Sequence, residues 1–353
     1  MLTLQAKVIA LSPTQTPVFG NKSTTPDPTP SLCSSQASSS YNFTAIDFEI
    51  YHHYIGHTSS TLGPGYPQIW RDIIPPIAFD HPFLLHGILA ITALHLIYLH
   101  PEKEHDYLIP AISHQDIALQ GYRIALADVS PYNCHAIFAF STLLIQHAFS
   151  APRAPGNLIF TGSHENEVVP CMKWLPLLNG SRSVVECSTE CLRSGPLAPF
   201  LLADKWKMFY QPITHLDPRA QEEDRQLSKL AQMWQAGTPL YGTAEADVYV
   251  QCLDQLRLSF AHGTRDGGNT AEFLMVGFSS WCIRIPDEYF KLLDQQKEGA
   301  LVILAHYFVL ADKLKGYWWV DGMAKDLIGK IHAMLNEEWW HWIEWPMKMV
   351  KIN

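Results

Sequence analysis

The chain has 353 residues, of which 47% are hydrophobic and only 17% are charged, so its composition predicts a large folded core and excludes a mainly disordered protein. The formal net charge is −9 with histidine neutral, and lysine and arginine form no run, which argues against direct binding to nucleic acid. The seven cysteines are scattered, the closest pair being Cys187 and Cys191, and neither a C-x-x-C motif nor zinc-ligand spacing occurs. We therefore predict free thiols in a reducing compartment, with no bound metal and no cofactor.

The N-terminal segment 1–40 is predicted to be a disordered leader. From residue 11 onward it is rich in Ser, Thr and Pro and has few large apolar side chains, so burial would not offset the loss of chain entropy. The first eleven residues contain too short an apolar run for a signal peptide. We expect the folded domain to cover residues 41–353.

The first part of that domain is predicted to be helical with two interruptions. An amphipathic helix is expected over 41–54, after which Gly63-Pro64-Gly65 and Pro75-Pro76 should break the chain. The segment 82–99 carries no formal charge and is nearly long enough to cross a bilayer. Because the uncharged stretch 83–100 contains three histidines and a threonine, we interpret 82–99 as a fully buried core helix that does not span a membrane.

Further helices are predicted along the rest of the chain. They are expected over 105–129, from an N-cap at Asn133 to Phe149, over 222–236 and 245–261, from Pro286 onward, over the charge-free segment 300–311, and over 321–338 as the last long helix. Residues 151–200 contain six prolines and are expected to form a long irregular loop. With no strand alternation and no internal repeat, the sequence predicts an all-α fold, a single irregular multi-helix domain.

Two polar groupings in the sequence are candidate sites for chemistry. His53 and His57 would share one helix face, a spacing that can hold zinc, but no glutamate lies between them and ordinary surface or capping histidines are favoured. The acidic run Glu222-Glu223-Asp224 is interpreted as a solvated helix start. Glycine-rich phosphate loops, a nucleophile elbow and a magnesium-binding aspartate cluster are missing from the sequence, so no catalytic residue is assigned.

Aromatic residues crowd the C-terminal part of the chain. Aromatics and methionines offer large contact area and adaptable shape, so they suit an apolar ligand pocket, although plain core packing explains them as well. Gly316 and Gly322 flank the aromatic turn, and glycine there allows an unusual backbone shape or a close approach of ligand. The candidate ligand-binding residues are Phe308, Tyr317, Trp318, Trp319, Gly322, Met323, Trp339 and Trp342.

Several of these stretches also resemble a known family. Trp70-Arg71-Asp72, the segment 78–87 and His114-Gln115 resemble the first block of fungal binuclear zinc-cluster transcription factors of the sterol uptake control type. Gly316-Tyr317-Trp318-Trp319 and Trp345-Pro346-Met347 are similar to the terminal block of that family. Family members place a six-cysteine zinc cluster and a basic segment before this domain, and this sequence contains neither.

The resemblance implies a helical regulatory domain that senses a sterol-like or other lipophilic ligand in the nucleus or cytoplasm. It would act through a transcriptional partner protein or a homodimer, and without direct DNA binding by this chain. The alternative is a cofactor-independent cyclase or isomerase of fungal natural-product biosynthesis built on the same helical domain. The two differ in whether the pocket holds a polar pair able to move protons. A purely structural partner protein is a third possibility.

Overall fold

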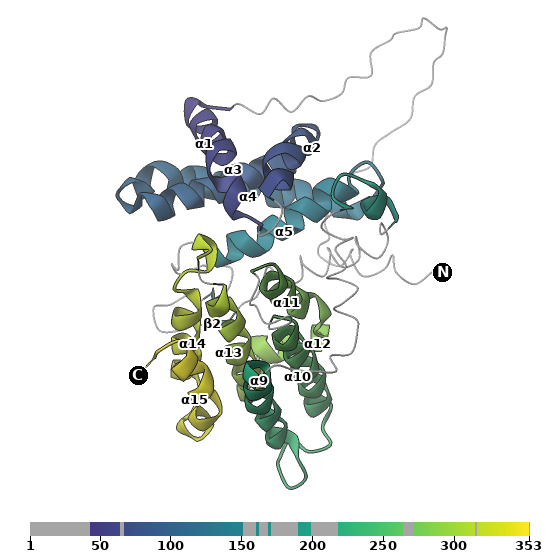
Figure 1. Cartoon of the computed structure of the whole chain (residues 1–353), viewed down its shortest axis with the longest axis vertical. Coiled ribbons are helices and arrows are strands. Elements are labelled where there is room, and N and C mark those ends of the chain that lie inside the picture. The colour runs from purple at the N-terminus through teal and green to yellow at the C-terminus, as the bar shows by residue number, and fades with distance from the viewer. Residues whose placement is uncertain are drawn as a thin grey trace, which may run out of the picture. The chain divides into compact units, whose positions relative to one another are not determined.

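The computed structural model describes residues 43–63, 67–150, 160–161, 169–170, 190–198, 218–263, 271–314 and 316–352. Within these ranges the chain is helical almost throughout, which confirms the predicted all-α fold (Figure 1). Strand pairing among the described residues is limited to Phe160–Thr161 (β1) and Val169–Pro170 (β2), which form a two-residue antiparallel ladder. The predicted leader 1–40, and most of the predicted loop 151–200, lie outside the described residues.

The first group of helices is built around one buried helix. It comprises α1 (Ala45–Gly56), α2 (Ile74–Asp80), α3 (Pro82–Leu99), α4 (Glu104–Ala127) and α5 (Cys134–Ser150), with short helical turns η1 (Thr58–Thr61), η2 (Ile69–Ile73) and η3 (Pro101–Lys103). Helix α3 packs against the other four. In the described part of the chain it is the one helix long and apolar enough to cross a membrane, yet 72% of it is buried inside the protein. This burial confirms the prediction of a core helix.

Two expectations for this group need correction. Pro75-Pro76 does not break the chain. The π-helical turn η2 runs directly into α2, and both prolines lie in the first turn of α2, where the fixed φ of proline suits the helix. Asn133 does precede α5, and its carbonyl accepts from Ile137 N. Its side-chain oxygen, however, accepts from Ser130 N at 2.8 Å and therefore belongs to the preceding turn.

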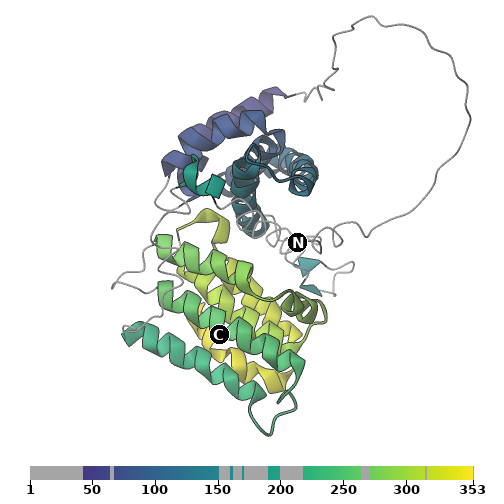
Figure 2. The same cartoon turned by 90° about the vertical axis from the view of Figure 1, so that its right-hand side faces the viewer.

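The second group of helices surrounds another charge-free segment. It comprises α9 (Pro218–Lys229), η4 (Leu230–Trp234), α10 (Ala244–Gly263), α11 (Ala271–Arg284), α12 (Asp287–Asp294), α13 (Glu298–Lys313), η6 (Trp318–Val320), α14 (Met323–Met334), η7 (Glu337–Trp339) and α15 (Trp340–Met349). The helices run side by side in both views (Figures 1 and 2). Helix α13 contacts α10, α11, α12, α14 and α15, and residues 299–311 are all buried, as predicted for 300–311.

The C-terminal end differs from the prediction of one helix over 321–338. Helix α14 stops at Met334, because Leu335 and Asn336 are extended, with ψ of 140° and 155°. A further helix, α15, follows and contains Pro346. Helix α11 was not predicted at all. Its close approach to α10 depends on Gly277, where an added Cβ would lie 2.7 Å from the carbonyl oxygen of Ser259.

Candidate functional site

The eight predicted ligand-binding residues differ in burial. Phe308, Trp318, Trp319 and Met323 are buried, and Tyr317, Trp339 and Trp342 are partly buried. Gly316 and Gly322 have φ of +104° and +66°, so the expected unusual backbone at both ends of the aromatic turn is present.

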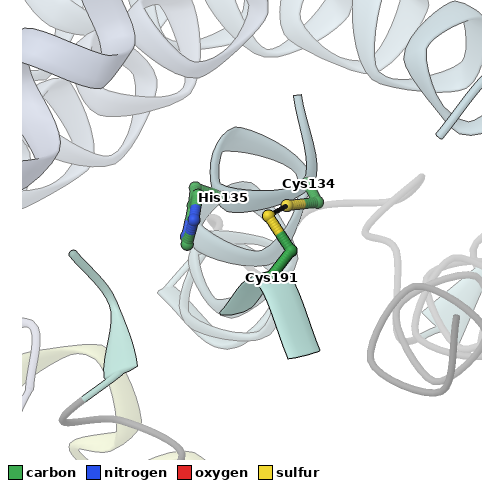
Figure 3. Close-up of side chains that lie close together, drawn as sticks. All are labelled: Cys134, His135 and Cys191. Carbon is green, nitrogen blue, oxygen red and sulfur yellow. Dashed lines mark hydrogen bonds between the residues drawn. The ribbon is translucent and has the colours of Figure 1, made fainter. Parts of the chain in front are cut away.

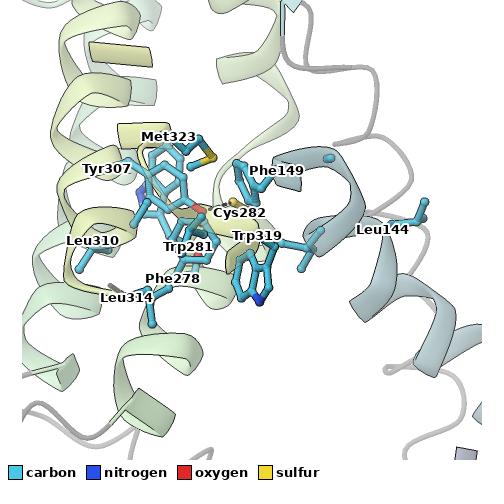
Figure 4. Packing of buried hydrophobic residues seen from close by; sticks show 14 of the residues in the cluster. Leu144, Phe149, Phe278, Trp281, Cys282, Tyr307, Leu310, Leu314, Trp319 and Met323 are labelled. Carbon is cyan, nitrogen blue, oxygen red and sulfur yellow. Dashed lines mark hydrogen bonds between the residues drawn. The ribbon is translucent and has the colours of Figure 1, made fainter. Parts of the chain in front are cut away.

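Trp318 and Trp319 are neighbours with different surroundings. The indole N–H of Trp318 donates to Thr61 Oγ1 at 2.9 Å, and its ring stacks on His95 at 4.6 Å between centroids. Trp319 is 1% exposed and lies beside Phe278, with the ring centroids 6.4 Å apart (Figure 4). Its Nε1 is buried and has no hydrogen-bond partner among the described residues. Both rings therefore belong to the core.

A cleft lies between α9, α13 and α15 and has a volume of about 620 Å³. One predicted residue, Trp342, lines it, together with Trp345 and His306. The other lining residues are Gln226, Lys229, Leu230, Gln232, His341, Glu344 and Lys348. A second hollow of about 390 Å³, lined by Glu344, Met347, Lys348, Lys351 and Ile352, shares two of these residues. Two indoles within a largely polar rim give the cleft an amphipathic character.

His306 supplies the cleft with a defined polar atom. Its Nδ1 lies 2.8 Å from the carbonyl oxygen of Val302, so Nδ1 carries the hydrogen and Nε2 keeps a lone pair. Burial lowers the pKa of His306 to about 4, which keeps the ring neutral at neutral pH. The ring stacks on Trp345, with the centroids 5.5 Å apart. Of the two ring nitrogens of His306, Nε2 is therefore the one with acceptor character.

The acidic run at the start of α9 is not a solvated helix start, contrary to prediction. Glu223 is 5% exposed and accepts from Lys313 Nζ at 2.5 Å, while Asp224 accepts two hydrogen bonds from Arg257 at 2.7 and 3.0 Å. These pairs join α9 to α13 and α10. They fix the position of α9, which forms one side of the cleft.

A buried polar chain connects α1, α3 and α4. Asp47 accepts from His114 Nε2 at 2.9 Å, and His114 Nδ1 lies 2.7 Å from His86 Nδ1. Burial acts to raise the pKa of Asp47, but hydrogen bonds from Thr44 and His114 bring it below the usual value, so the carboxylate is ionised. His114 Nε2 therefore carries the hydrogen in its bond to Asp47. Since all three side chains are buried and line neither hollow, we interpret this hydrogen-bonded group of side chains as structural.

The predicted histidine pair does share one face. The rings of His53 and His57 lie 4.9 Å apart, with His57 at the C-cap of α1, and His95 approaches His53 to 5.3 Å. His95 Nδ1 is held by Thr58 Oγ1 at 2.8 Å. In the described part of the chain these rings do not bring three ligand atoms together as a metal ion requires. The capping interpretation therefore fits His57.

Sequence reasoning missed a cysteine–histidine group that forms where α5 begins. Cys134 Sγ and Cys191 Sγ lie 3.4 Å apart, and a nitrogen of His135 lies within 4.8 Å of both (Figure 3). Burial and the neighbouring Cys191 raise the pKa of the Cys134 thiol to about 12. Burial lowers the pKa of His135. Cys191 is 57 residues from Cys134, so no local spacing in the sequence could have revealed the group.

The comparisons with known proteins agree with this architecture. Residues 49–188, which include α2 to α5, match the family model described as a fungal specific transcription factor domain. Over these residues the chain is therefore similar to a fungal specific transcription factor domain, in line with the sequence resemblance.

Individual relatives extend the likeness. A Zn(2)-C6 fungal-type transcription factor of Gibberella zeae is 24% identical over 345 residues, which cover 92% of this chain and 65% of the relative. Sterol uptake control protein 2 of Saccharomyces cerevisiae is 32% identical over 147 residues, covering 41% of this chain and 15% of the relative. The protein of the same name from Candida albicans is 29% identical over 166 residues, covering 46% and 22%. The chain thus spans less than two thirds of the length of each.

Proposed function

We propose that the chain regulates transcription in the nucleus in response to a lipophilic small molecule with a hydroxyl group, bound in the cleft between α9, α13 and α15. The observation that carries this proposal is the amphipathic cleft lined by Trp342, Trp345 and His306 in a chain similar to fungal transcription factors. The printed names of two relatives concern control of sterol uptake, and a sterol has an apolar body and one hydroxyl.

The size and chemistry of the cleft suit such a ligand. A volume of about 620 Å³ lies within the roughly 300–1,000 Å³ that small-molecule sites occupy. The indoles of Trp342 and Trp345 offer flat apolar contact, and a neutral His306 accepts one hydrogen bond at Nε2. Burying an apolar ligand gives on the order of 25 cal/mol per Å², part of which offsets lost ligand freedom, so affinity on the order of micromolar is expected.

The regulatory output is proposed to pass through protein contacts. The net charge of −9 and the missing basic runs leave little for a phosphate backbone to bind. A transcriptional partner protein or a second copy of the chain would therefore receive the signal of ligand binding. The enzyme alternative is not favoured, because the relatives are transcription factors.

Titration with a fluorescent sterol tests the cleft directly, and α15 offers a matched control. Trp342→Ala removes a cleft-lining indole and should weaken binding at least about tenfold, the loss expected for a buried aromatic contact. Trp340→Ala removes an exposed indole of the same helix and should leave binding unchanged. His306→Phe should weaken binding of the sterol and leave binding of its hydroxyl-free analogue unaffected.

Two outcomes would contradict the proposal. If Gly322→Asp abolishes sterol binding while Trp342→Ala does not, the ligand lies at the aromatic turn and the cleft assignment is wrong. If no sterol or terpenoid alcohol changes the tryptophan fluorescence of the wild-type chain, ligand sensing itself is wrong.

A further inference from the structure

We propose that Cys134, His135 and Cys191 form a zinc-binding site that joins the start of α5 to the helical residues 190–194. The three side chains come from two segments that are distant in sequence, and their ligand atoms all lie within 4.8 Å of one another (Figure 3). Two thiolates and one imidazole are a ligand set that zinc prefers. Three protein ligands would leave the fourth tetrahedral position to solvent.

The distance between the two sulfurs favours a metal ion over a disulfide bond. With Zn–S bonds of about 2.3 Å and a tetrahedral angle, two ligating sulfurs lie about 3.8 Å apart. The observed separation of Cys134 Sγ and Cys191 Sγ is 3.4 Å, so zinc would require an opening of only about 0.4 Å. A disulfide at about 2.05 Å would require the sulfurs to approach by more than 1 Å.

The imidazole of His135 is placed for coordination. Its Nδ1 is buried and has no hydrogen-bond partner among the described residues, although such a nitrogen normally has one. Its ring is held against Gly195, where an added Cβ would lie 2.2 Å from Nε2. Glycine at this position therefore leaves the room that the ring needs, and a metal ion would give the ring nitrogen a partner.

Without the metal, both thiols lie close to one backbone acceptor. Cys191 Sγ lies 3.7 Å from the carbonyl oxygen of Pro131 and donates a weak hydrogen bond to it, while the single S–H of Cys134 points either to the same oxygen at 3.6 Å or to Cys191 Sγ at 3.4 Å. Zinc binding breaks both S–H bonds, forms two Zn–S bonds and one Zn–N bond, and releases two protons to solvent. No electron is transferred in this step, so the site needs only reduced thiols and zinc.

The test uses the full chain, purified under reductant and stripped of metal, and titrated with zinc against a chelating dye. The wild type should bind about one zinc ion at this site. Cys191→Ser should weaken that binding by more than about a hundredfold, because loss of a mere outer-shell partner already costs 10–100-fold. Cys191 is only half-buried, so this variant should keep its fold, which circular dichroism would verify. His135→Ala should have the same effect.

Two further measurements make the result specific. Cys252→Ala removes a buried cysteine far in sequence from the group and should leave zinc binding unchanged. Cobalt substituted for zinc should show a thiolate-to-metal charge-transfer band in the wild type that Cys134→Ser diminishes. The proposal is overturned if the reduced wild type binds no zinc at micromolar concentration, or if Cys191→Ser and His135→Ala bind it as tightly as the wild type. Formation of a Cys134–Cys191 disulfide by peroxide in a chain that binds no zinc would likewise overturn it.

Discussion

Acidification from pH 7.5 to pH 5.5 should destabilise this protein strongly, because it buries four neutral histidines. His86, His95, His147 and His306 are between 1% and 8% exposed, and burial lowers the pKa of each to about 4. In the unfolded chain the same residues have a pKa near 6.5. Below that value the unfolded state binds more protons than the folded state. The stability that the four neutral histidines contribute is therefore fully present above pH 6.5 and is lost as the pH falls toward 4.

The expected size of the effect follows from these pKa values. At pH 5.5 a histidine with a pKa of 6.5 when unfolded and about 4 when folded contributes roughly 1.4 kcal/mol less stability than at high pH. Four such residues together give roughly 5 kcal/mol if they act independently. That is comparable with the whole free energy of unfolding of many domains, about 5–15 kcal/mol.

Denaturant unfolding followed by circular dichroism at pH 7.5, 6.5 and 5.5 would measure this loss. His147→Leu is the informative variant, because it removes a buried group whose Nδ1 has no hydrogen-bond partner among the described residues. Its free energy of unfolding should fall by roughly 1.4 kcal/mol less than that of the wild type between pH 7.5 and 5.5. His105→Gln changes a side chain that is 78% exposed and should follow the wild type. Equal stability of the wild type at pH 7.5 and 5.5 would refute the reasoning.

Two substitutions test the packing of the second group of helices. Gly277→Ala should destabilise the protein by about 1–3 kcal/mol, because the new methyl would meet the carbonyl of Ser259 at 2.7 Å. The control Gly329→Ala, whose methyl meets nothing within 4 Å, should be neutral or should stabilise the protein by up to about 1 kcal/mol. Equal melting temperatures of the two variants would contradict this prediction. Lys313→Met should cost about 3–5 kcal/mol by leaving Glu223 charged and buried, and adding Glu223→Gln should restore much of the loss, as denaturant midpoints would show. A double variant as unstable as Lys313→Met alone would mean that lost packing, and not the stranded charge, is responsible.

The sequence predicted the buried helices well, because the lack of charged residues that marks them can be recognised without knowing their tertiary contacts. The segments 82–99 and 300–311 carry no charge, and a helix without a polar face has to be buried on all sides. Boundaries were predicted less well. A proline such as Pro346 disfavours a helix, yet it lies inside α15. Pro75-Pro76 predicts a break from sequence alone, whereas in the structure both prolines lie in the first turn of α2.

The candidate sites depended on contacts that no window of sequence contains. Cys191 joins Cys134 and His135 only because residues 190–194 return to the start of α5. Glu223 looked solvated because its partner, Lys313, is 90 residues away. Long-range pairs of this kind follow from the fold, and they decide whether a polar residue is a surface feature, a structural link or a ligand.

The tryptophans of the C-terminal part show how the structure separates residues that the sequence treats as equal. An indole N–H that already has a fixed partner in the protein serves the fold: Trp318 donates to Thr61, and Trp340 donates to the carbonyl of Leu335 at 3.0 Å. Trp319 is enclosed in the core, where a ligand would have to displace packed side chains. Trp342 lines an open cleft beside a neutral histidine, so it can contact a ligand without disturbing the core. Of these four rings, Trp342 is therefore the one whose loss should affect binding more than folding.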